Sequence, residues 1–358
     1  MMINLQEIYS EYKLFKYTEV LKKINKKQIS PPVHIRIKPT NICNHDCWYC
    51  AYRTSNLELG SQMKIRDQIP FDKFNEIADD IVSMGVKAVT FSGGGEPLLY
   101  KKLPLIIKKM AKGGVKIGSL TNGSNLKGNM ATAFQKYGSW VRISLDGFDD
   151  KSYSKARGVR NNAFSQLLEN IKNFTSINSE CIVGCAVIVD NINYTHIYKL
   201  CSKLKSVGVQ NVKISGVVVG NTAEKNNQYH YKIKNVVSNE IKKCNKLIDN
   251  KFLIINHYHD LNSRFDKDYN TCPFIFFRPV IGADSMVYTC QDKAYTKSGA
   301  LGSIKNKSFK EFWFSEIARN KIYKINPEVL CNHHCISHSK NKIIHQYLNI
   351  DEDHSCFT

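Results

Sequence analysis

Three cysteines near the start of the chain have a spacing that is suited to binding a metal cluster. Cys43, Cys47 and Cys50 form a C-x3-C-x2-C run. Iron-sulfur clusters are bound by thiolates, and three thiolates can bind three irons of a [4Fe-4S] cubane. The fourth iron is then open to a substrate or a cofactor. A structural zinc site would need a fourth ligand, for which His45 is a candidate, and buried cysteines without a ligand are the remaining alternative.

A glycine run follows, and it could hold a cationic group. Residues Ser92 to Leu98 read S-G-G-G-E-P-L, directly after an apolar segment from Val86 to Phe91. Because glycine has no side chain, backbone carbonyls in such a run can approach a ligand closely. This is suited to an amino group, although the same run alone would be an ordinary turn.

The segments around these motifs alternate between strand-like and helix-like patterns. Residues Val33 to Ile37 alternate apolar and polar side chains, as a strand does. Helices are predicted over 71–84, 102–111, 129–137, 164–174 and 197–207, and further strands over 86–91, 115–120, 141–145, 182–189 and 212–219. Strands joined by helical crossovers predict an α/β fold with a parallel sheet. We expect this sheet to form a partial (βα)6 barrel of the TIM type.

We expect the chain to divide into four parts. Residues 1–30 form an N-terminal helical segment, residues 31–220 the partial barrel, and residues 221–265 a linker and helix. Residues 266–358 are rich in Cys and His and are predicted to form a small α+β domain. The first boundary after the barrel lies where the apolar pattern gives way to a polar run, near Gly220.

The cysteine loop and the glycine run together resemble the radical S-adenosylmethionine (radical SAM) superfamily, over about residues 33–220. The resemblance implies that Cys43, Cys47 and Cys50 bind a [4Fe-4S] cluster and that S-adenosylmethionine chelates its open iron. One electron, from a flavodoxin- or ferredoxin-type donor, would cleave that cofactor to methionine and a 5′-deoxyadenosyl radical, which abstracts a substrate hydrogen. We expect the cofactor at the carboxyl ends of the strands, as ligands in barrels are.

The same resemblance implies a set of residues that contact S-adenosylmethionine. Tyr49 is expected near the adenine, the glycines and Glu96 at the methionine amine, and polar residues at later strand ends at the ribose and carboxylate. Arg157 could pair with the carboxylate, or could be an ordinary exposed arginine at a helix end. The expected cofactor-binding residues are Tyr49, Gly93, Gly94, Gly95, Glu96, Asn122, Ser144 and Arg157.

A second set of cysteines lies in the C-terminal part. Its members are Cys272, Cys290, Cys331 and Cys335. Their arrangement looks like the twitch domain, the shortened form of the SPASM extension, which binds one auxiliary [4Fe-4S] cluster. The alternatives are a structural zinc ion and an incomplete site that uses Cys356 or His333.

Four other cysteines fall in apolar segments and are expected in the core. They are Cys181, Cys185, Cys201 and Cys244. A buried thiol behaves as a small hydrophobic group. Cys185 could instead face the barrel interior and donate a hydrogen atom to a radical.

The composition limits the partners and the compartment. The 51 Lys and Arg residues outnumber the 31 Asp and Glu residues, which gives a net charge of +20. The lysines are spread along the chain, so we expect a general bias and no nucleic-acid partner, although an anionic substrate fits. No apolar run is long enough to cross a membrane, and the N-terminus lacks a secretory pattern. A cytoplasmic protein is expected, in which twelve cysteines favour metal ligation over disulfides.

We therefore predict an anaerobic radical SAM oxidoreductase that acts on a polar, sugar-like small molecule. An auxiliary cluster could accept a second electron, which favours oxidation (dehydrogenation), and redox-neutral rearrangement is also compatible. One alternative is a peptide or protein maturase that forms thioether or carbon–carbon crosslinks, epimerises residues or oxidises side chains. The other is an RNA-modifying enzyme.

Overall fold

A single open sheet organises the fold. The computed structural model describes residues 10–54, 57–258, 264–351 and 353–357. Within these ranges ten strands lie in the order β10-β9-β8-β1-β2-β3-β4-β5-β6-β7. The strands are β1 (His34–Ile37), β2 (Ala88–Phe91), β3 (Lys116–Thr121), β4 (Gly138–Leu145), β5 (Ile182–Val189), β6 (Asn211–Gly216), β7 (Leu253–His257), β8 (Val280–Ile281), β9 (Met286–Tyr288) and β10 (Ala300–Ser303).

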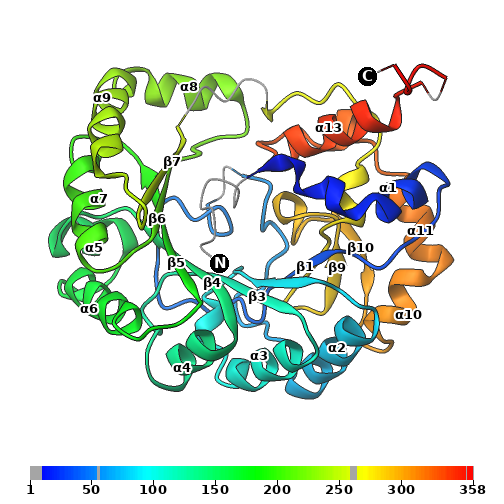
Figure 1. The fold of residues 1–358 in the computed structure, drawn as a ribbon, viewed down its shortest axis with the longest axis horizontal. Coiled ribbons are helices and arrows are strands. Elements are labelled where there is room, and N and C mark those ends of the chain that lie inside the picture. Colours follow the sequence, from blue (N-terminus) through cyan, green and yellow to red (C-terminus); the bar gives the residue numbers. More distant parts are fainter. Residues whose placement is uncertain (1–9, 55–56, 259–263, 352, 358) are drawn as a thin grey trace.

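Strands β1 to β7 are all parallel to their neighbours and form a curved sheet that does not close (Figure 1). This confirms the predicted α/β fold with a partial barrel. The sheet contains one more parallel strand than the sequence predicted. Residues 221–265, expected as a linker and helix, contain α8 (Ala223–Tyr231), α9 (Lys234–Cys244) and the additional strand β7.

Helices cover the outer face of this sheet (Figure 1). They are α2 (Phe71–Ser83), α3 (Leu103–Lys112), α4 (Gly128–Tyr137), α6 (Ala163–Thr175) and α7 (Ile197–Ser206). Each has apolar residues at helical spacing on one face, as Phe74, Ile77 and Ile81 show in α2, and these side chains are fully buried. Burial of each such side chain contributes about 1.5–3 kcal/mol.

A short helix that the sequence analysis did not predict, α5 (Asp150–Arg157), follows β4. Asp149 and Ser152 form a capping box at its start. Gly158 ends it in the left-handed conformation with φ 60°. These two signals fix the end of the helix, and therefore the position of Arg157.

The C-terminal segment extends the sheet of the barrel. Strand β8 pairs with β1 in parallel, and β9 and β10 follow in antiparallel order. The backbone N–H groups of β1 and of the residue after it donate to the carbonyls of Phe277, Pro279 and Ile281 at 2.9, 3.1 and 2.9 Å. The segment also contains α10 (Phe309–Phe314), α11 (Glu316–Tyr323), α12 (Pro327–Leu330) and α13 (His338–Leu348).

The N-terminal segment packs against this C-terminal part. It contains the 3-10 helix η2 (Glu11–Tyr17) and α1 (Thr18–Asn25), and α1 lies beside α13 (Figure 1). The predicted helical segment at 1–30 is therefore present in part, and residues 1–9 lie outside the described ranges. The fully buried Trp313 donates its indole N–H to the Ser30 carbonyl at 2.7 Å. Among the described helices, none has the length and apolar character needed to span a bilayer.

Candidate active site

The three cysteines of the first motif lie in the loop after β1. Cys43, Cys47 and Cys50 are free thiols and partly exposed. Burial raises the pKa of Cys47 to about 11, and the charges of Cys43 and Cys50 act in the same direction. The three thiols are therefore close enough to influence one another. A bound cationic metal centre would favour their thiolate forms.

Arg157 reaches this loop from the end of α5. Its Nε donates to Asp146 Oδ1 at 2.8 Å, and its Nη1 donates to Cys47 Sγ at 3.5 Å. Only 3% of Arg157 is exposed, so it is not an ordinary exposed arginine at a helix end. Burial alone would lower the pKa of Arg157, but Asp146, Tyr49 and Cys47 together outweigh this effect and raise the pKa well above its usual value. Its Nη2 is buried and has no hydrogen-bond partner among the described residues, so its N–H can donate to a ligand oxygen.

The groups around this pair hold it in place. Asn193 donates its amide to the carbonyls of Asp146 and Ile188, both at 2.7 Å. The Arg157 guanidinium lies 5.6 Å from the ring centre of Tyr49, the residue expected near adenine. Sequence reasoning missed Asn193, because it lies in a polar loop after β5 that has no motif of its own.

The glycine run packs directly against the cysteine loop. A Cβ atom on Gly94 would lie 2.1 Å from the Asn41 side-chain oxygen, and one on Gly95 would lie 2.1 Å from the Ile42 carbonyl oxygen. Gly93 is equally crowded, since its Cβ would lie 1.8 Å from the carbonyl oxygen of Gly95. The run does not use left-handed φ angles. Glycine is therefore required here by close approach.

Glu96 connects the glycine run to the end of β3. Its carboxylate accepts hydrogen bonds from the Thr121 hydroxyl at 2.5 Å and from the backbone N–H groups of Asn122 and Leu98 at 2.6 and 3.0 Å. Burial raises the pKa of Glu96. The carboxylate is occupied by protein donors, so its contribution to the site is to position Asn122.

Asn122 and Ser144 lie at the carboxyl ends of β3 and β4, as expected. Asn122 donates its amide to Asn44 Oδ1 of the cysteine loop at 2.9 Å. Ser144 is partly exposed, and the described residues provide no hydrogen bond to its side chain. The structure therefore brings Asn122 to the cysteine loop and leaves the Ser144 hydroxyl accessible.

A buried lysine that sequence reasoning missed joins three parts of the site. Lys38 donates to the Gly93 carbonyl at 2.6 Å, the Tyr52 hydroxyl at 2.6 Å and Gln291 Oε1 at 3.0 Å. Burial lowers the pKa of Lys38 well below its usual value. One signal in the sequence could have identified Lys38. The alternation of β1 places Lys38 on the same side of the strand as Arg36. This side chain links the glycine run, the cysteine loop and the residue after Cys290.

The four C-terminal cysteines line one small cavity. These residues are Cys272, Cys290, Cys331 and Cys335. His333 lines the same cavity, is buried, and has no hydrogen-bond partner for either ring nitrogen among the described residues. Burial lowers the pKa of His333 to about 3, so its imidazole is neutral. Cys356 is exposed and donates to the Asp353 carbonyl at 3.4 Å, away from this cavity.

The donor sets match soft metal ligation, because they consist of thiols and a neutral imidazole. Within the described ranges, no three His, Cys, Asp or Glu side chains already stand in the arrangement of a formed metal site.

One of the predicted alternatives for the remaining cysteines is wrong. Gly184 lines the interior of the barrel, and adjacent residues of a strand point to opposite faces. Cys185 therefore points toward the outer helices, where it is fully buried in the core, and cannot donate a hydrogen atom inside the barrel. The other three of this group are buried in the core, as predicted: Cys181, Cys201 and Cys244.

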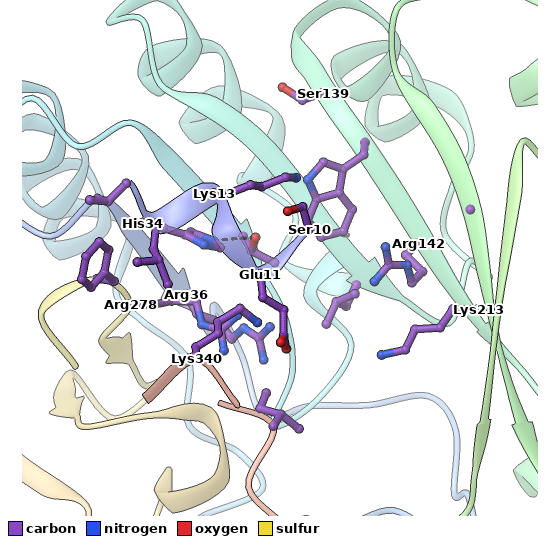
Figure 2. A pocket seen from close by; sticks show the side chains of 18 of the residues that line it. Ser10, Glu11, Lys13, His34, Arg36, Ser139, Arg142, Lys213, Arg278 and Lys340 are labelled. Carbon is purple, nitrogen blue, oxygen red and sulfur yellow. Dashed lines mark hydrogen bonds between the residues drawn. The ribbon is translucent and has the colours of Figure 1, made fainter. Parts of the chain in front are cut away.

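A large cavity occupies the interior of the barrel (Figure 2). Its volume is about 730 Å³, and interior-facing residues of the strands line it, among them Arg36, Thr90 and Arg142. Arg142 precedes Ser144 by two residues on β4, so both side chains are on the same face of the sheet. The cavity therefore lies on the face of the sheet that carries the expected cofactor-binding groups.

One family model and several solved structures match this chain. The model of the Radical SAM superfamily matches residues 37–218, just over half of the chain. A crystal structure of Streptococcus suis SuiB bound to S-adenosylmethionine superimposes with a TM-score of 0.61 at 16% identity, covering 86% of this chain and 72% of SuiB. SuiB bound to its precursor peptide SuiA gives the same TM-score. At this identity the likeness shows the fold alone.

Two curated relatives match parts of the chain. An S-adenosylmethionine-dependent nucleotide dehydratase of Lacinutrix mariniflava is 31% identical over 113 residues, which are 32% of this chain and 23% of that protein. A GTP 3′,8-cyclase of Staphylococcus aureus is 28% identical over 199 residues, which are 55% of this chain and 58% of that protein. The chain thus spans less than two thirds of either relative.

Proposed function

Because this chain belongs to the radical SAM superfamily, we propose that it generates a 5′-deoxyadenosyl radical and abstracts a hydrogen atom from a polar small molecule. The family implies a [4Fe-4S] cluster and S-adenosylmethionine as cofactors. One observation carries the proposal. The Arg157 guanidinium contacts Cys47 of the three-thiol loop, and its buried Nη2 has no partner within the described part of the chain. A guanidinium N–H in that position is suited to the carboxylate of a bound amino acid.

Most of the predicted residues have a direct role in this proposal. Cys43, Cys47 and Cys50 would hold the cluster, which supplies the electron that breaks a carbon–sulfur bond of S-adenosylmethionine. Arg157 Nη1 would stabilise negative charge on the Cys47 sulfur, while Nη2 binds the methionine carboxylate. Ser144 and Asn122 would contact the ribose hydroxyls, and Tyr49 the adenine. The Gly93 carbonyl is occupied by Lys38, so the backbone of Gly94 and Gly95 is left for the methionine amine.

The size of the barrel cavity supports a small-molecule substrate. A volume of about 730 Å³ lies within the range of ligand pockets, about 300–1,000 Å³. The names of the two curated relatives state action on nucleotides, which are polar and contain a sugar. We propose oxidation or rearrangement of a sugar-like, polar substrate. Maturation of a peptide has in its favour the likeness to SuiB and to anSMEcpe with bound Cp18Cys peptide, and that likeness concerns the fold.

We further propose that the C-terminal cysteines bind a second [4Fe-4S] cluster. The support is that all four thiols line one cavity, together with a neutral histidine that lacks a partner among the described residues. A second cluster would accept an electron during a net oxidation. A flavodoxin or ferredoxin is the class of donor that the first cluster would need.

Anaerobic reconstitution tests both parts of the proposal. Iron and sulfide per chain, and 5′-deoxyadenosine formed from S-adenosylmethionine, are measured for the wild type and for a Cys43→Ala/Cys47→Ala/Cys50→Ala variant. We expect about eight irons falling to about four, with loss of 5′-deoxyadenosine. A Cys272→Ala/Cys290→Ala variant should also retain about four irons but still form 5′-deoxyadenosine.

The exposed Cys356 provides the control, since Cys356→Ala should change neither quantity. About four irons in the wild type, all lost with the first three cysteines, would contradict the second cluster and favour redox-neutral chemistry. Full 5′-deoxyadenosine formation without the first three cysteines would contradict the proposed function itself.

A further inference from the structure

The cavity inside the barrel contains a strong excess of positive charge (Figure 2). Among the described residues, seven Lys and Arg side chains line it against one carboxylate, that of Glu11. The seven are Lys13, Arg36, Arg142, Lys213, Arg264, Arg278 and Lys340. They come from η2, from β1, β4 and β6, and from the C-terminal half of the chain, so only the fold brings them together.

The positive charges of these side chains are close enough to repel one another. Burial lowers the pKa of Lys213 to about 8, and the positive charges of Arg142 and Arg264 lower it further. Burial also lowers the pKa of Arg36 to about 10, and Arg278 adds to this effect. Like charges in a partly buried space cost stability unless an anion offsets them.

Among the described residues, few carboxylates stand near this charge. Glu11 accepts a hydrogen bond from the Ser339 hydroxyl. The buried Asp292 carboxylate favours the charged forms of Arg36 and Arg278. The same carboxylate also accepts a hydrogen bond from the Ile336 N–H at 2.9 Å. Arg36 Nε is buried and has no hydrogen-bond partner among the described residues. The cavity is thus built for a ligand that carries several negative charges.

We propose that this cavity binds the oligophosphate group of the substrate, a di- or triphosphate. A chain of phosphates places several charges along one line, and guanidinium groups bind phosphate oxygens in pairs. Because Arg142 lies two residues before Ser144 on β4, the phosphates would sit deeper in the barrel than the cofactor. The remainder of the substrate would then extend toward the cofactor. The proposal that the cavity binds an oligophosphate is argued from the cavity alone. The proposal that this oligophosphate belongs to the substrate of a radical reaction rests on the proposed function.

Calorimetric titration of the full chain with inorganic tripolyphosphate tests the proposal, at an ionic strength that suppresses surface binding. The test variant is Lys213→Gln, and the matched control is Lys116→Gln, which removes an exposed charge at the start of β3. We expect one site in the wild type, about tenfold weaker binding in Lys213→Gln, and unchanged affinity in Lys116→Gln. Inorganic monophosphate should bind much more weakly than tripolyphosphate.

Thermal unfolding gives a second readout that shows whether the variant is folded. Without ligand, Lys213→Gln should melt at a higher temperature than the wild type, because a repelled charge is gone. With tripolyphosphate, its melting temperature should rise by less than that of the wild type.

Equal tripolyphosphate affinity in all three proteins, or no binding to the wild type, would overturn the proposal. Its failure is distinct from failure of the proposed function. Formation of 5′-deoxyadenosine without tripolyphosphate binding overturns only the oligophosphate site. Tripolyphosphate binding without 5′-deoxyadenosine formation overturns only the radical chemistry.

Discussion

Arg157 combines a structural role and a chemical role in one side chain. It neutralises the buried carboxylate of Asp146 through its Nε, and its Nη1 donates to Cys47 of the cysteine loop. The Asp146 and Arg157 side chains are only 1% and 4% exposed, so neither charge can be solvated if the other is removed. Substitution of one member of this pair is therefore a sensitive test of the geometry around the cysteine loop.

We predict that Arg157→Met lowers the free energy of unfolding by about 3–5 kcal/mol, because it leaves the Asp146 carboxylate buried without a partner. Urea unfolding at pH 7 measures the change. The double variant Asp146→Asn/Arg157→Met should recover much of the loss. Lys22→Met, which breaks an exposed ion pair with Glu19, should have no measurable effect. A loss below about 1 kcal/mol for the single variant would contradict the role given to this pair.

The pH dependence of the free energy of unfolding should show the effect of burying Lys213 beside other positive charges in the barrel. The pKa of Lys213 is about 8 in the folded chain, against about 10.4 when unfolded. Between these values the unfolded state binds more protons, so this group makes the wild type more stable as pH rises from about 8 toward 10. We predict that Lys213→Gln is more stable than wild type at pH 7 and that the difference shrinks by pH 10. A difference that is constant with pH would contradict this assignment.

The sequence could reveal those site residues whose signal is local. Cys43, Cys47 and Cys50 are identified by spacing within one loop, and the fold keeps them together. Asn193 and Lys38 could not be found in this way, because their partners lie far away in the sequence, as Gln291 does for Lys38. Burial of such polar groups depends on the assembled sheet.

At the scale of elements, the cysteine loop and the glycine run form one packed unit. The backbone of Gly95 donates to the Thr40 carbonyl at 3.1 Å, and that of Glu96 donates to the Ile42 carbonyl at 2.9 Å. The shape of the cysteine loop therefore depends on a neighbour more than forty residues later in the chain. A side chain added between the two would push them apart.

We predict that Gly95→Ala loses the iron bound by the first three cysteines while the iron of the C-terminal cysteines remains. The added Cβ would lie 2.1 Å from the Ile42 carbonyl oxygen, which is backbone and cannot rotate away. Iron per chain after anaerobic reconstitution is the measurement.

Gly220→Ala is the matched control, because its Cβ would meet only the Lys225 side chain, at 3.3 Å. Its iron content should equal that of the wild type. Full iron loading of Gly95→Ala would show that the glycine run does not support the cysteine loop.

The elements that the sequence predicted were those with a periodic pattern of apolar residues. Strand β5 was predicted over its observed range, and the bounds of α2 differ from the prediction by one residue. Strand β7 reads L-I-I-N-H and does not alternate apolar and polar residues, and β8 has only two residues, so neither shows a strand pattern. Helix α5 has a mostly polar sequence, so its capping residues are a better signal than its periodicity.

At the scale of the whole molecule, the C-terminal segment completes the sheet. Strand β8 covers the side of β1 that β2 does not, and the indole of Trp313 fixes the chain just before β1. The cysteine loop that follows β1 therefore depends on both halves of the chain.

We predict that a chain ending at residue 265 does not reach the native fold. The N–H groups of β1 would lose the Phe277, Pro279 and Ile281 carbonyls, and an open strand edge promotes aggregation. Size-exclusion chromatography and circular dichroism of the shortened chain measure this. A monodisperse, cooperatively unfolding product would show that residues 31–265 fold independently.

The clustering of basic residues in the barrel cavity could not be predicted from the sequence. An even spread of lysines along the chain predicted a general bias. Seven of the basic residues nevertheless meet in one cavity, from segments that are up to 327 positions apart, between Lys13 and Lys340. No local pattern marks such a group, because each residue alone looks like an ordinary strand or helix residue.

The pairing of β1 with β8 also affects how the chain is made. During synthesis β1 leaves the ribosome early, but its second neighbour follows only after more than 240 further residues. Contacts over such a separation form late, and an unpaired strand edge meanwhile attracts other chains. The nascent protein thus carries three free thiols beside an uncovered edge until β8 has been made. We expect its yield in cells to depend on chaperones and on delaying cluster insertion until β8 has paired with β1.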